Sequence, residues 1–353
     1  MAGLTLAQRD LAETREQLHR WFERELGRPI AHSELSQANA SIGWSSESLL
    51  FSINLSDANL EGRGEFVIRI PPAGGGIYAE YDLEGQTKTH ELLRRHGIAA
   101  PSPARYEPDS AWIGSKFMVM PRIVGHTPAE VTYATTGWLH DAGAHVQRRV
   151  HDGFLDTLLA LQRIPAAEAP WLERPGGAGA EGELEWWREF VDWGTDGATP
   201  DLVIEAFDWL QRRLPTEPTE LGVSWGDPRF SNVMFDDTGA VAGVLDWEQA
   251  CLCPAEADLA WWLTTRRNTM AVCRITADPE LPGFDSRADA VRRFEEMIGR
   301  PLVAMDWYEV FAAVRMGCCL LRMQVLLRST GQDDHPLANA RPLPKWTVEA
   351  IRA

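Results

Sequence analysis

The fold of this chain is decided by the stretch Val223-Ser-Trp-Gly-Asp-Pro-Arg-Phe-Ser-Asn232 and by the run Val241-Ala-Gly-Val-Leu-Asp246-Trp-Glu that follows it after a turn. A loop carries Asp227 and, five residues later, Asn232. Two short strands joined by the turn are predicted next, and the second of them leads to Asp246. One compact segment thus brings two carboxylates and an amide together. A plain turn is the competing interpretation, because glycine, aspartate and asparagine all favour turns.

Outward from this stretch, the chain changes character near residues 120–125. The N-terminal part shows an amphipathic helix over residues 5–26, a second helix over 81–96, and runs typical of strands near 36–44, 48–55, 65–70, 104–107 and 116–120. The C-terminal part shows helical patterns over residues 145–163, 181–193, 200–214, 255–266, 287–298 and 306–328. We therefore predict an α+β fold with two lobes. Residues 1–121 hold a small antiparallel sheet of about five strands with a leading helix, and residues 122–353 form a larger, mainly helical lobe.

The composition is that of an ordinary globular protein, with 44% hydrophobic and 24% charged residues among 353. No stretch approaches the roughly 20 apolar residues that would span a bilayer, and no signal-like segment opens the chain, so a cytoplasmic protein without a membrane partner is expected. The net charge of -17 opposes attraction to nucleic acid. It favours a cationic ligand, although an acidic surface also simply keeps a protein in solution. We expect a monomer or a homodimer.

The central stretch has the groups that phosphoryl transfer needs. That reaction uses a carboxylate to align and deprotonate the acceptor hydroxyl, and oxygen ligands for the Mg²⁺ that neutralises a triphosphate. The spacing resembles the catalytic loop and metal-binding segment of the protein-kinase-like fold. The specific variant resembles the aminoglycoside phosphotransferase family, whose signature is His-Gly-Asp-x-x-x-x-Asn with a downstream Ile/Leu-Asp-Trp/Phe-Glu. The segment Cys253-Pro-Ala-Glu-Ala-Asp258-Leu-Ala is also similar to that family.

This resemblance implies a bilobal kinase-like fold and a role for each residue of the stretch. Asp227 is the expected catalytic base. Arg229 is the expected cation that stabilises charge on the transferred phosphoryl group. Asn232 and Asp246 are the expected Mg²⁺ ligands.

Two further positions of the motif concern the support of the catalytic loop. Asp258 is expected to buttress that loop. Trp225 departs from the family, because it stands where the signature has histidine. The resemblance therefore leaves the geometry of the loop open.

The N-terminal lobe is expected to bind ATP or GTP. The turn Ser41-Ile-Gly43-Trp-Ser45-Ser46-Glu resembles the family's nucleotide-covering loop, in which glycine permits close approach and hydroxyls contact phosphate. The strand ending in Phe66-Val-Ile-Arg69-Ile-Pro-Pro resembles the kinase lysine strand. Arg69 is then expected to bind the α and β phosphates and to pair with Glu84, although a surface salt bridge is the alternative.

The adenine ring is expected to lie against apolar residues. Phe117-Met-Val-Met120 resembles the family's hinge, whose backbone binds the adenine edge, although the segment could equally be a core strand. By the same alignment Met234 and Leu245 form the floor beneath the ring.

The acceptor site is expected in the helical lobe. Acidic and aromatic residues gather over 181–196, where Glu185 and Glu189 are candidates for acceptor binding. A second candidate wall contains Trp307, Tyr308 and Arg315. Tryptophans at helical spacing are more often core residues, and acidic residues between them more often face water.

Three functions follow from these features. The first is a Mg²⁺-dependent phosphotransferase acting on a hydroxyl of a small molecule, as in an aminoglycoside phosphotransferase. The second is a kinase of a hydroxyacyl-CoA or another hydroxylated metabolite, because the Leu-Asp-Trp-Glu variant resembles kinase-like domains associated with acyl-CoA metabolism. The third belongs to another class and is a nucleotide-binding pseudokinase that regulates a partner. Retention of Asp227, Asn232 and Asp246 together argues against that third function.

Overall fold

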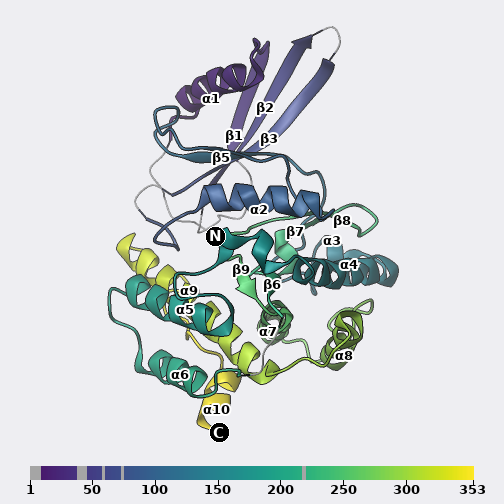
Figure 1. Cartoon of the computed structure of the whole chain (residues 1–353), viewed down its shortest axis with the longest axis vertical. Coiled ribbons are helices and arrows are strands. Elements are labelled where there is room, and N and C mark those ends of the chain that lie inside the picture. The colour runs from purple at the N-terminus through teal and green to yellow at the C-terminus, as the bar shows by residue number, and fades with distance from the viewer. Residues whose placement is uncertain (1–8, 38–45, 58–59, 73–74, 217–219) are drawn as a thin grey trace. The chain divides into compact units, whose positions relative to one another are not determined.

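The computed structural model describes residues 9–37, 46–57, 60–72, 75–216 and 220–353 (Figure 1). The chain divides into two compact units. The first unit comprises Met1–Glu91, Pro101–Arg122 and Arg322–Asn339, and the second comprises Leu92–Ala100, Ile123–Leu321 and Ala340–Ala353. The division after Arg122 lies one residue from the expected boundary, whereas residues 92–100 and 322–339 belong to the other unit than that boundary implies.

The first unit is built on a five-stranded antiparallel sheet, as predicted. The strand order is β1-β2-β3-β5-β4. The strands are β1 (His32–Gln37), β2 (Glu47–Asp57), β3 (Leu60–Ile70), β4 (Arg105–Glu107) and β5 (Phe117–Pro121). In β2, Leu49, Phe51 and Ile53 alternate along the strand and are buried on one face, the period expected of a strand with a single core side.

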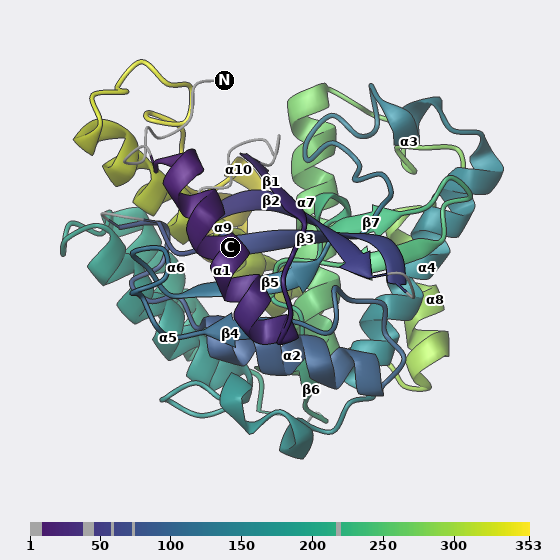
Figure 2. The ribbon, with the colours of Figure 1, turned by 90° about the horizontal axis from the view of Figure 1, so that it is seen from above.

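Helix α1 (Leu11–Leu26) covers that face of the sheet, as Figure 2 shows. Leu18, Trp21 and Phe22 lie within one turn and pack against the sheet residues. The Asp10 side chain caps the helix N-terminus by accepting from two backbone N–H groups, and Gly27 ends the helix with a φ of 64°. Beside the opposite face, Leu83 at the start of α2 (Leu83–Arg95) packs with Met118 and Met120.

The second unit is mainly helical, as predicted. Its helices are α3 (Trp138–Asp141), α4 (Ala144–Gln162), α5 (Gly179–Gly194), α6 (Asp201–Arg212), α7 (Ala255–Cys273), α8 (Arg287–Ile298), most of α9 (Met305–Ser329) and α10 (Lys345–Arg352). Two short antiparallel pairs lie among them: β6 (Gly222–Ser224) with β9 (Cys251–Cys253), and β7 (Val233–Phe235) with β8 (Val241–Val244). The rings of Phe154, Trp225, Phe230 and Trp262 meet in the core of this unit.

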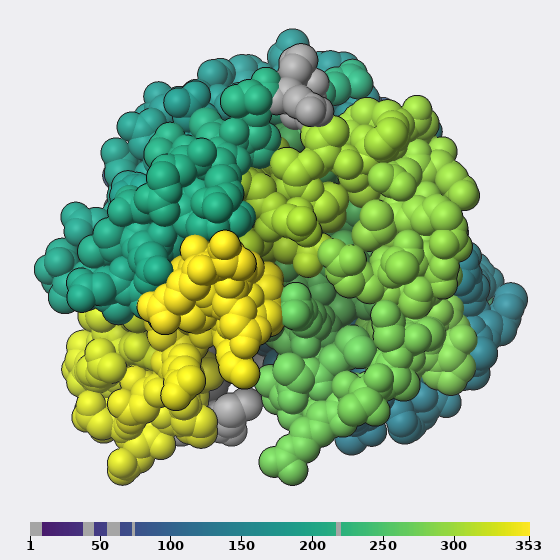
Figure 3. All heavy atoms as spheres, turned by 90° about the horizontal axis from the view of Figure 1, so that it is seen from below, coloured from purple at the N-terminus to yellow at the C-terminus, as the bar shows by residue number. Residues whose placement is uncertain are grey.

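Helix α10 closes one face of the second unit, where it lies beside α6 (Figure 3). Arg352 near its end pairs with Glu205 of α6 at 3.1 Å. Helix α9 corrects one sequence expectation, because it is long and apolar enough to cross a membrane by length and composition. Of its most apolar window 67% is buried within the protein, which is also the character of a core helix.

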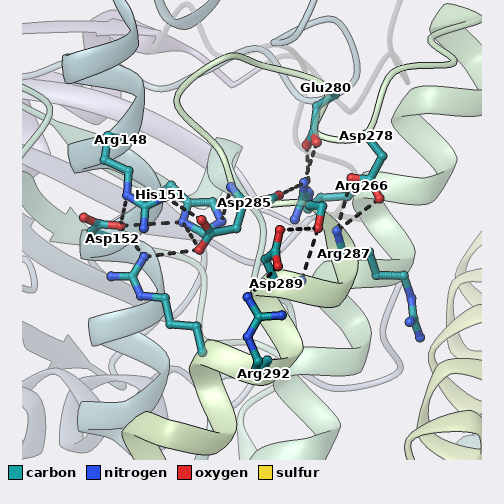
Figure 4. Close-up of polar contacts among 12 residues, drawn as sticks. Arg148, His151, Asp152, Arg266, Asp278, Glu280, Asp285, Arg287, Asp289 and Arg292 are labelled. Carbon is teal, nitrogen blue, oxygen red and sulfur yellow. Dashed lines mark hydrogen bonds and ion pairs between the residues drawn. The ribbon is translucent and has the colours of Figure 1, made fainter.

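A network of charged side chains joins α4, α7 and α8 (Figure 4). Within it, Arg266 of α7 donates through Nε to the buried carboxylate of Glu280 at 2.8 Å, and Tyr133 donates its hydroxyl to the same carboxylate at 2.8 Å. The rings of Tyr133 and Phe284 pack against Phe230, with centroids at 5.3 and 5.1 Å. This network therefore supports the loop that contains Asp227.

Candidate active site

The loop between β6 and β7 carries the central motif and is held from behind by Asp258 of α7. Both oxygens of that buried carboxylate are used: they accept from Ser224 Oγ at 2.7 Å, from the backbone N–H of Trp225 at 2.7 Å and from that of Gly226 at 3.0 Å. Burial raises the pKa of Asp258, and these three donors oppose that rise. Asp258 thus buttresses the loop as the motif predicted.

Asp227 is the centre of the site, with 6% of its surface exposed. Its Oδ1 accepts from the indole N–H of Trp261 at 2.9 Å. Its Oδ2 accepts from Asn232 Nδ2 at 3.1 Å and lies 3.0 Å from Arg229 Nη2. Three partners from two segments therefore fix the plane of this carboxylate.

The electrostatics of the site raise the basicity of Asp227. Burial raises its pKa to about 6. The Arg229 guanidinium opposes this shift most, the charges of Asp246 and Glu130 add to it, and the hydrogen bond from Trp261 opposes it. A carboxylate with such a pKa can accept a proton near neutral pH.

Asn232 and Asp246 are the residues that would hold a divalent cation. Asn232 Nδ2 donates both to the backbone oxygen and to the carboxylate of Asp227, at 3.1 Å each, which leaves the amide oxygen for a cation. The backbone N–H of Leu245 donates to the Asn232 carbonyl at 2.9 Å, so the residue before Asp246 is tied to Asn232. Oxygen ligands are those that Mg²⁺ prefers, and the residues present fit that ion.

Asp246 adopts a left-handed backbone conformation, with a φ of 64°. This conformation is uncommon for a residue other than glycine and is frequent at functional sites. Among the described residues no group of three or more His, Cys, Asp or Glu side chains is placed to hold a metal. The predicted ligand set is smaller, with one amide and one carboxylate.

Arg229 contacts two carboxylates at once. In addition to Asp227, its Nη1 donates to the carboxylate of Glu130, which is 60% exposed. The sequence did not single out Glu130, which lies 99 positions away in the chain. The cation that the motif places near the transferred phosphoryl group is therefore already beside the base.

Trp225 fills the position at which the signature has histidine, and its side chain is fully buried. Its indole N–H donates to the backbone oxygens of Leu245, at 2.9 Å, and Asp246, at 3.2 Å. The ring stacks against Trp247 with centroids 5.7 Å apart. The substituted residue thus joins the loop of Asp227 to the segment of Asp246.

The model of the phosphotransferase enzyme family matches residues 54–291, a range that contains the whole of this motif. The chain belongs to this family. It is a phosphotransferase.

Solved structures share the fold of this phosphotransferase. A proposed aminoglycoside phosphotransferase from Ralstonia eutropha superposes with a TM-score of 0.71 at 18% identity, covering 96% of this chain and 98% of that one. An ethanolamine kinase from Plasmodium vivax superposes with a TM-score of 0.59 at 10% identity, covering 94% of this chain and 84% of that one. The predicted α+β protein-kinase-like fold is confirmed.

Among curated proteins, acyl-CoA dehydrogenase family member 11 of Pongo abelii and of Homo sapiens is similar to the phosphotransferase, at 24% and 25% identity over 198 residues. These residues make up 55% of this chain and 24% of each relative. The match thus spans about a quarter of the relatives' length.

The expected nucleotide contacts of the phosphotransferase are placed as follows. Gly43 and Ser45 lie outside the described residues. Ser46 is buried just before β2, and Arg69 lies in β3 opposite Ser48 and Met118. Glu84 lies 2.7 Å from Lys88 one turn further along α2, so its pairing with Arg69 stays a prediction.

The three expected adenine contacts differ in their burial. Met120 is buried in β5, and Met234 in β7 is partly buried. Leu245 is partly buried directly before Asp246. Their contact with a nucleotide stays a prediction.

The expected acceptor contacts separate into two kinds. Glu185 and Glu189 are exposed on α5. Trp307 and Tyr308 are 3% and 2% exposed, and the Trp307 indole donates to the Leu210 carbonyl at 2.9 Å. These two aromatic side chains pack in the core, and they would have to leave it to touch an acceptor.

Proposed function

We propose that this phosphotransferase is a magnesium-dependent kinase that transfers the γ-phosphoryl group of ATP or GTP to a hydroxyl group of a small molecule. The observation that carries the proposal is the buried carboxylate of Asp227, held by Trp261, Asn232 and Arg229 beside Asp246. Phosphoryl transfer requires little covalent chemistry from the protein, so a rigid base beside a cation and two oxygen ligands is the arrangement it needs.

Each residue has a defined part in the reaction. The acceptor oxygen forms a bond to the γ-phosphorus, the bond from that phosphorus to the β–γ bridging oxygen breaks, and the nucleoside diphosphate leaves. Asp227 accepts the hydroxyl proton, which its raised pKa permits. Arg229 stabilises the charge on the transferred group. Asn232 and Asp246 would hold Mg²⁺, which neutralises the phosphates when bound.

An aminoglycoside is the first candidate acceptor. The net charge of -17 favours a polycationic ligand at long range. The exposed carboxylate of Glu130 lies beside the catalytic arginine, where it can bind an ammonium group. The exposed carboxylates of Glu185 and Glu189 add negative charge to α5.

A hydroxyacyl-CoA is the second candidate acceptor. It is favoured by the similarity to acyl-CoA dehydrogenase family member 11, whose name refers to acyl-CoA. It is opposed by the charge of the chain, because coenzyme A is itself an anion. A pseudokinase is the candidate from another class, and the orientation of Asp227 by three partners argues against it, because a binding module needs no base.

A screen of ADP release tests the proposal. Wild-type protein is assayed with ATP and Mg²⁺ against aminoglycosides, macrolides, amino alcohols and hydroxyacyl-CoAs. We expect release that depends on one acceptor class, and we expect Asp227→Asn to reduce it by about 10²- to 10⁴-fold because a positioned base supplies that much. Asp156→Asn, an exposed residue of α4, is the matched control and should remain within about twofold.

The outcomes separate the candidates. Response to aminoglycosides supports the first acceptor, and response to hydroxyacyl-CoAs supports the second. Acceptor-dependent turnover that survives in Asp227→Asn would contradict the assignment of the base. Nucleotide binding without turnover on any acceptor class would favour the pseudokinase.

A further inference from the structure

Arg315 of α9 is a buried cation whose position the reaction described above does not explain. Its side chain is 2% exposed. Among the described residues it forms no ion pair with a carboxylate; its Nη2 donates instead to the Gly226 carbonyl at 2.7 Å and to Gln249 Oε1 at 3.0 Å. Burying a charge without a directly paired carboxylate is costly, and Arg315 acts on the buried Asp258 only at longer range, where burial raises the pKa of that carboxyl and the guanidinium lowers it.

Three aromatic rings surround the guanidinium and offset part of this cost. Its central carbon lies 4.5 Å from the ring centroid of Trp261, 4.9 Å from that of Trp187 and 5.7 Å from that of Phe311. Cation–π contacts are stabilising, and more so when the groups are desolvated. Arg315 is therefore held where α5, α7 and α9 converge.

The first acceptor of Arg315 is the residue that precedes the catalytic base. Gly226 donates its N–H to Asp258 and accepts from Arg315 with its carbonyl oxygen, so buried groups of opposite charge hold both ends of this residue. The second acceptor, Gln249, lies three residues after Asp246. One guanidinium thus ties the segment before Asp227 to the segment after Asp246.

The shortest ring contact of Arg315 also leads to the base. The indole of Trp261 stacks against the guanidinium and donates its N–H to Asp227 Oδ1 at 2.9 Å. We propose that Arg315 is a positioning residue that orients the Asp227 carboxylate by two routes, through the Gly226 carbonyl and through the Trp261 ring. The proposal rests on the proposed function, in which Asp227 is the base.

The sequence suggested another role, because Arg315 belonged to a candidate acceptor wall. The structure places it behind the catalytic loop, with its donors on backbone and amide oxygens. A displacement of a reacting group by about 1 Å costs roughly 10²-fold in rate. We therefore expect loss of the guanidinium to lower kcat by about 10- to 100-fold while KM for the nucleotide stays within about twofold.

The first test needs no acceptor. In a proton–nitrogen correlation spectrum of the 15 tryptophan indoles, Trp261→Phe assigns the Trp261 signal, and Asp227→Asn should move it because the hydrogen-bond acceptor changes. Arg315→Lys keeps the charge but loses the planar fork, so it should move the same signal. Arg328→Lys is the matched control, because Arg328 also lies on α9 and donates to a backbone oxygen, that of Ala338 at 3.0 Å.

Two results would overturn the positioning role. One is an unmoved Trp261 signal in folded Arg315→Lys, and the other is a shift equal to that of Arg328→Lys. If Arg315→Lys does not fold, Gln249→Met removes one acceptor with little change in volume, and an unmoved signal there counts against the proposal in the same way.

The kinetic readout separates this inference from the proposed function. With the acceptor identified, Arg315→Lys should lower kcat and leave KM for the nucleotide unchanged. A moved Trp261 signal in Arg315→Lys together with full turnover in Asp227→Asn would support the positioning role and refute the catalytic assignment. An unmoved Trp261 signal in Arg315→Lys together with an inactive Asp227→Asn would refute the positioning role and support the catalytic assignment.

Discussion

Trp225 holds the backbone of Asp246: its indole N–H lies 3.2 Å from the Asp246 carbonyl oxygen and 2.9 Å from that of Leu245. The indole thus connects the loop of the base to a proposed metal ligand that has a left-handed backbone. A histidine at this position would have a smaller ring, and the space would be filled less well. The residue at which the chain departs from the family signature therefore links the two segments.

We predict that Trp225→Phe weakens the use of Mg²⁺. The phenyl ring keeps the packing against Trp247 and Phe154 but lacks the donor, so the two carbonyl oxygens lose their partner. We expect a several-fold rise in the Mg²⁺ concentration for half-maximal activity and a loss of about 1 kcal/mol in the free energy of unfolding.

Trp247→Phe is the control for this change, because Trp247 is buried as well and donates to the Val244 carbonyl at 3.3 Å. Its Mg²⁺ dependence should match that of the wild type. Equal effects of the two substitutions would show that Trp225 acts through general packing.

Gly226→Ala should be far more damaging than a matched glycine substitution. Gly226 and Gly299 both have a positive φ, 83° and 79°, and Gly299 lies in the left-handed region at the end of α8. A Cβ on Gly226 would lie 2.1 Å from the Gln249 carbonyl oxygen, whereas one on Gly299 would meet nothing within 4 Å. Gly299→Ala therefore carries the backbone strain alone, about 1 kcal/mol, and Gly226→Ala adds a clash worth roughly 3 kcal/mol.

Urea unfolding of the two glycine variants measures this difference. A Gly226→Ala protein that is as stable as Gly299→Ala would mean that the segments before Asp227 and after Asp246 do not lie in contact.

His90 should make the first unit less stable in mild acid. Burial lowers its pKa from 6.5 to about 4, with Arg69 adding to the effect, and its Nδ1 donates to the Pro101 carbonyl at 2.8 Å. Because the folded pKa is the lower one, the unfolded chain binds the proton first, and stability is lost as the pH falls from 6.5 to 4. The size of this loss is about 3 kcal/mol.

His90→Asn retains a donor for Pro101 but does not titrate, so its unfolding free energy should fall less over the same pH range than that of the wild type. His32→Asn, at a half-exposed surface histidine, is the control and should follow the wild type. Parallel pH curves for His90→Asn and the wild type would exclude His90 as the source.

The sequence predicted those parts of the molecule whose signals are local. The hairpin of β7 and β8, the five-stranded sheet and α8 over Arg287–Ile298 follow from turn residues and periodicity. The helix expected over 255–266 continues to Cys273, because residues 267–273 include no glycine or proline that would end it. The short strands β6 and β9 and the terminal helix α10 were missed.

The sequence identified the central motif of the candidate site but not the residues that contact it from elsewhere in the chain. Asp227 and Asn232 share one short loop, so their contact could be expected, while the metal-binding role of Asp246 stays a prediction. Trp261 and Glu130 reach the same site from 34 and 99 positions away, and no local pattern marks such contacts. Trp307 and Tyr308 were expected to bind the acceptor but are buried in the core, where aromatic residues at helical spacing usually lie.

Binding of Mn²⁺ in the presence of ATP, followed by electron paramagnetic resonance, tests most directly whether Asn232 and Asp246 serve one metal site beside the base. We predict that Asn232→Ala and Asp246→Ala each weaken Mn²⁺ binding by about tenfold or more. Asp237→Ala, at a 93% exposed residue of the intervening turn, should leave it unchanged. Unchanged Mn²⁺ affinity in both of the first two variants would contradict the assignment of this loop as a phosphoryl-transfer site.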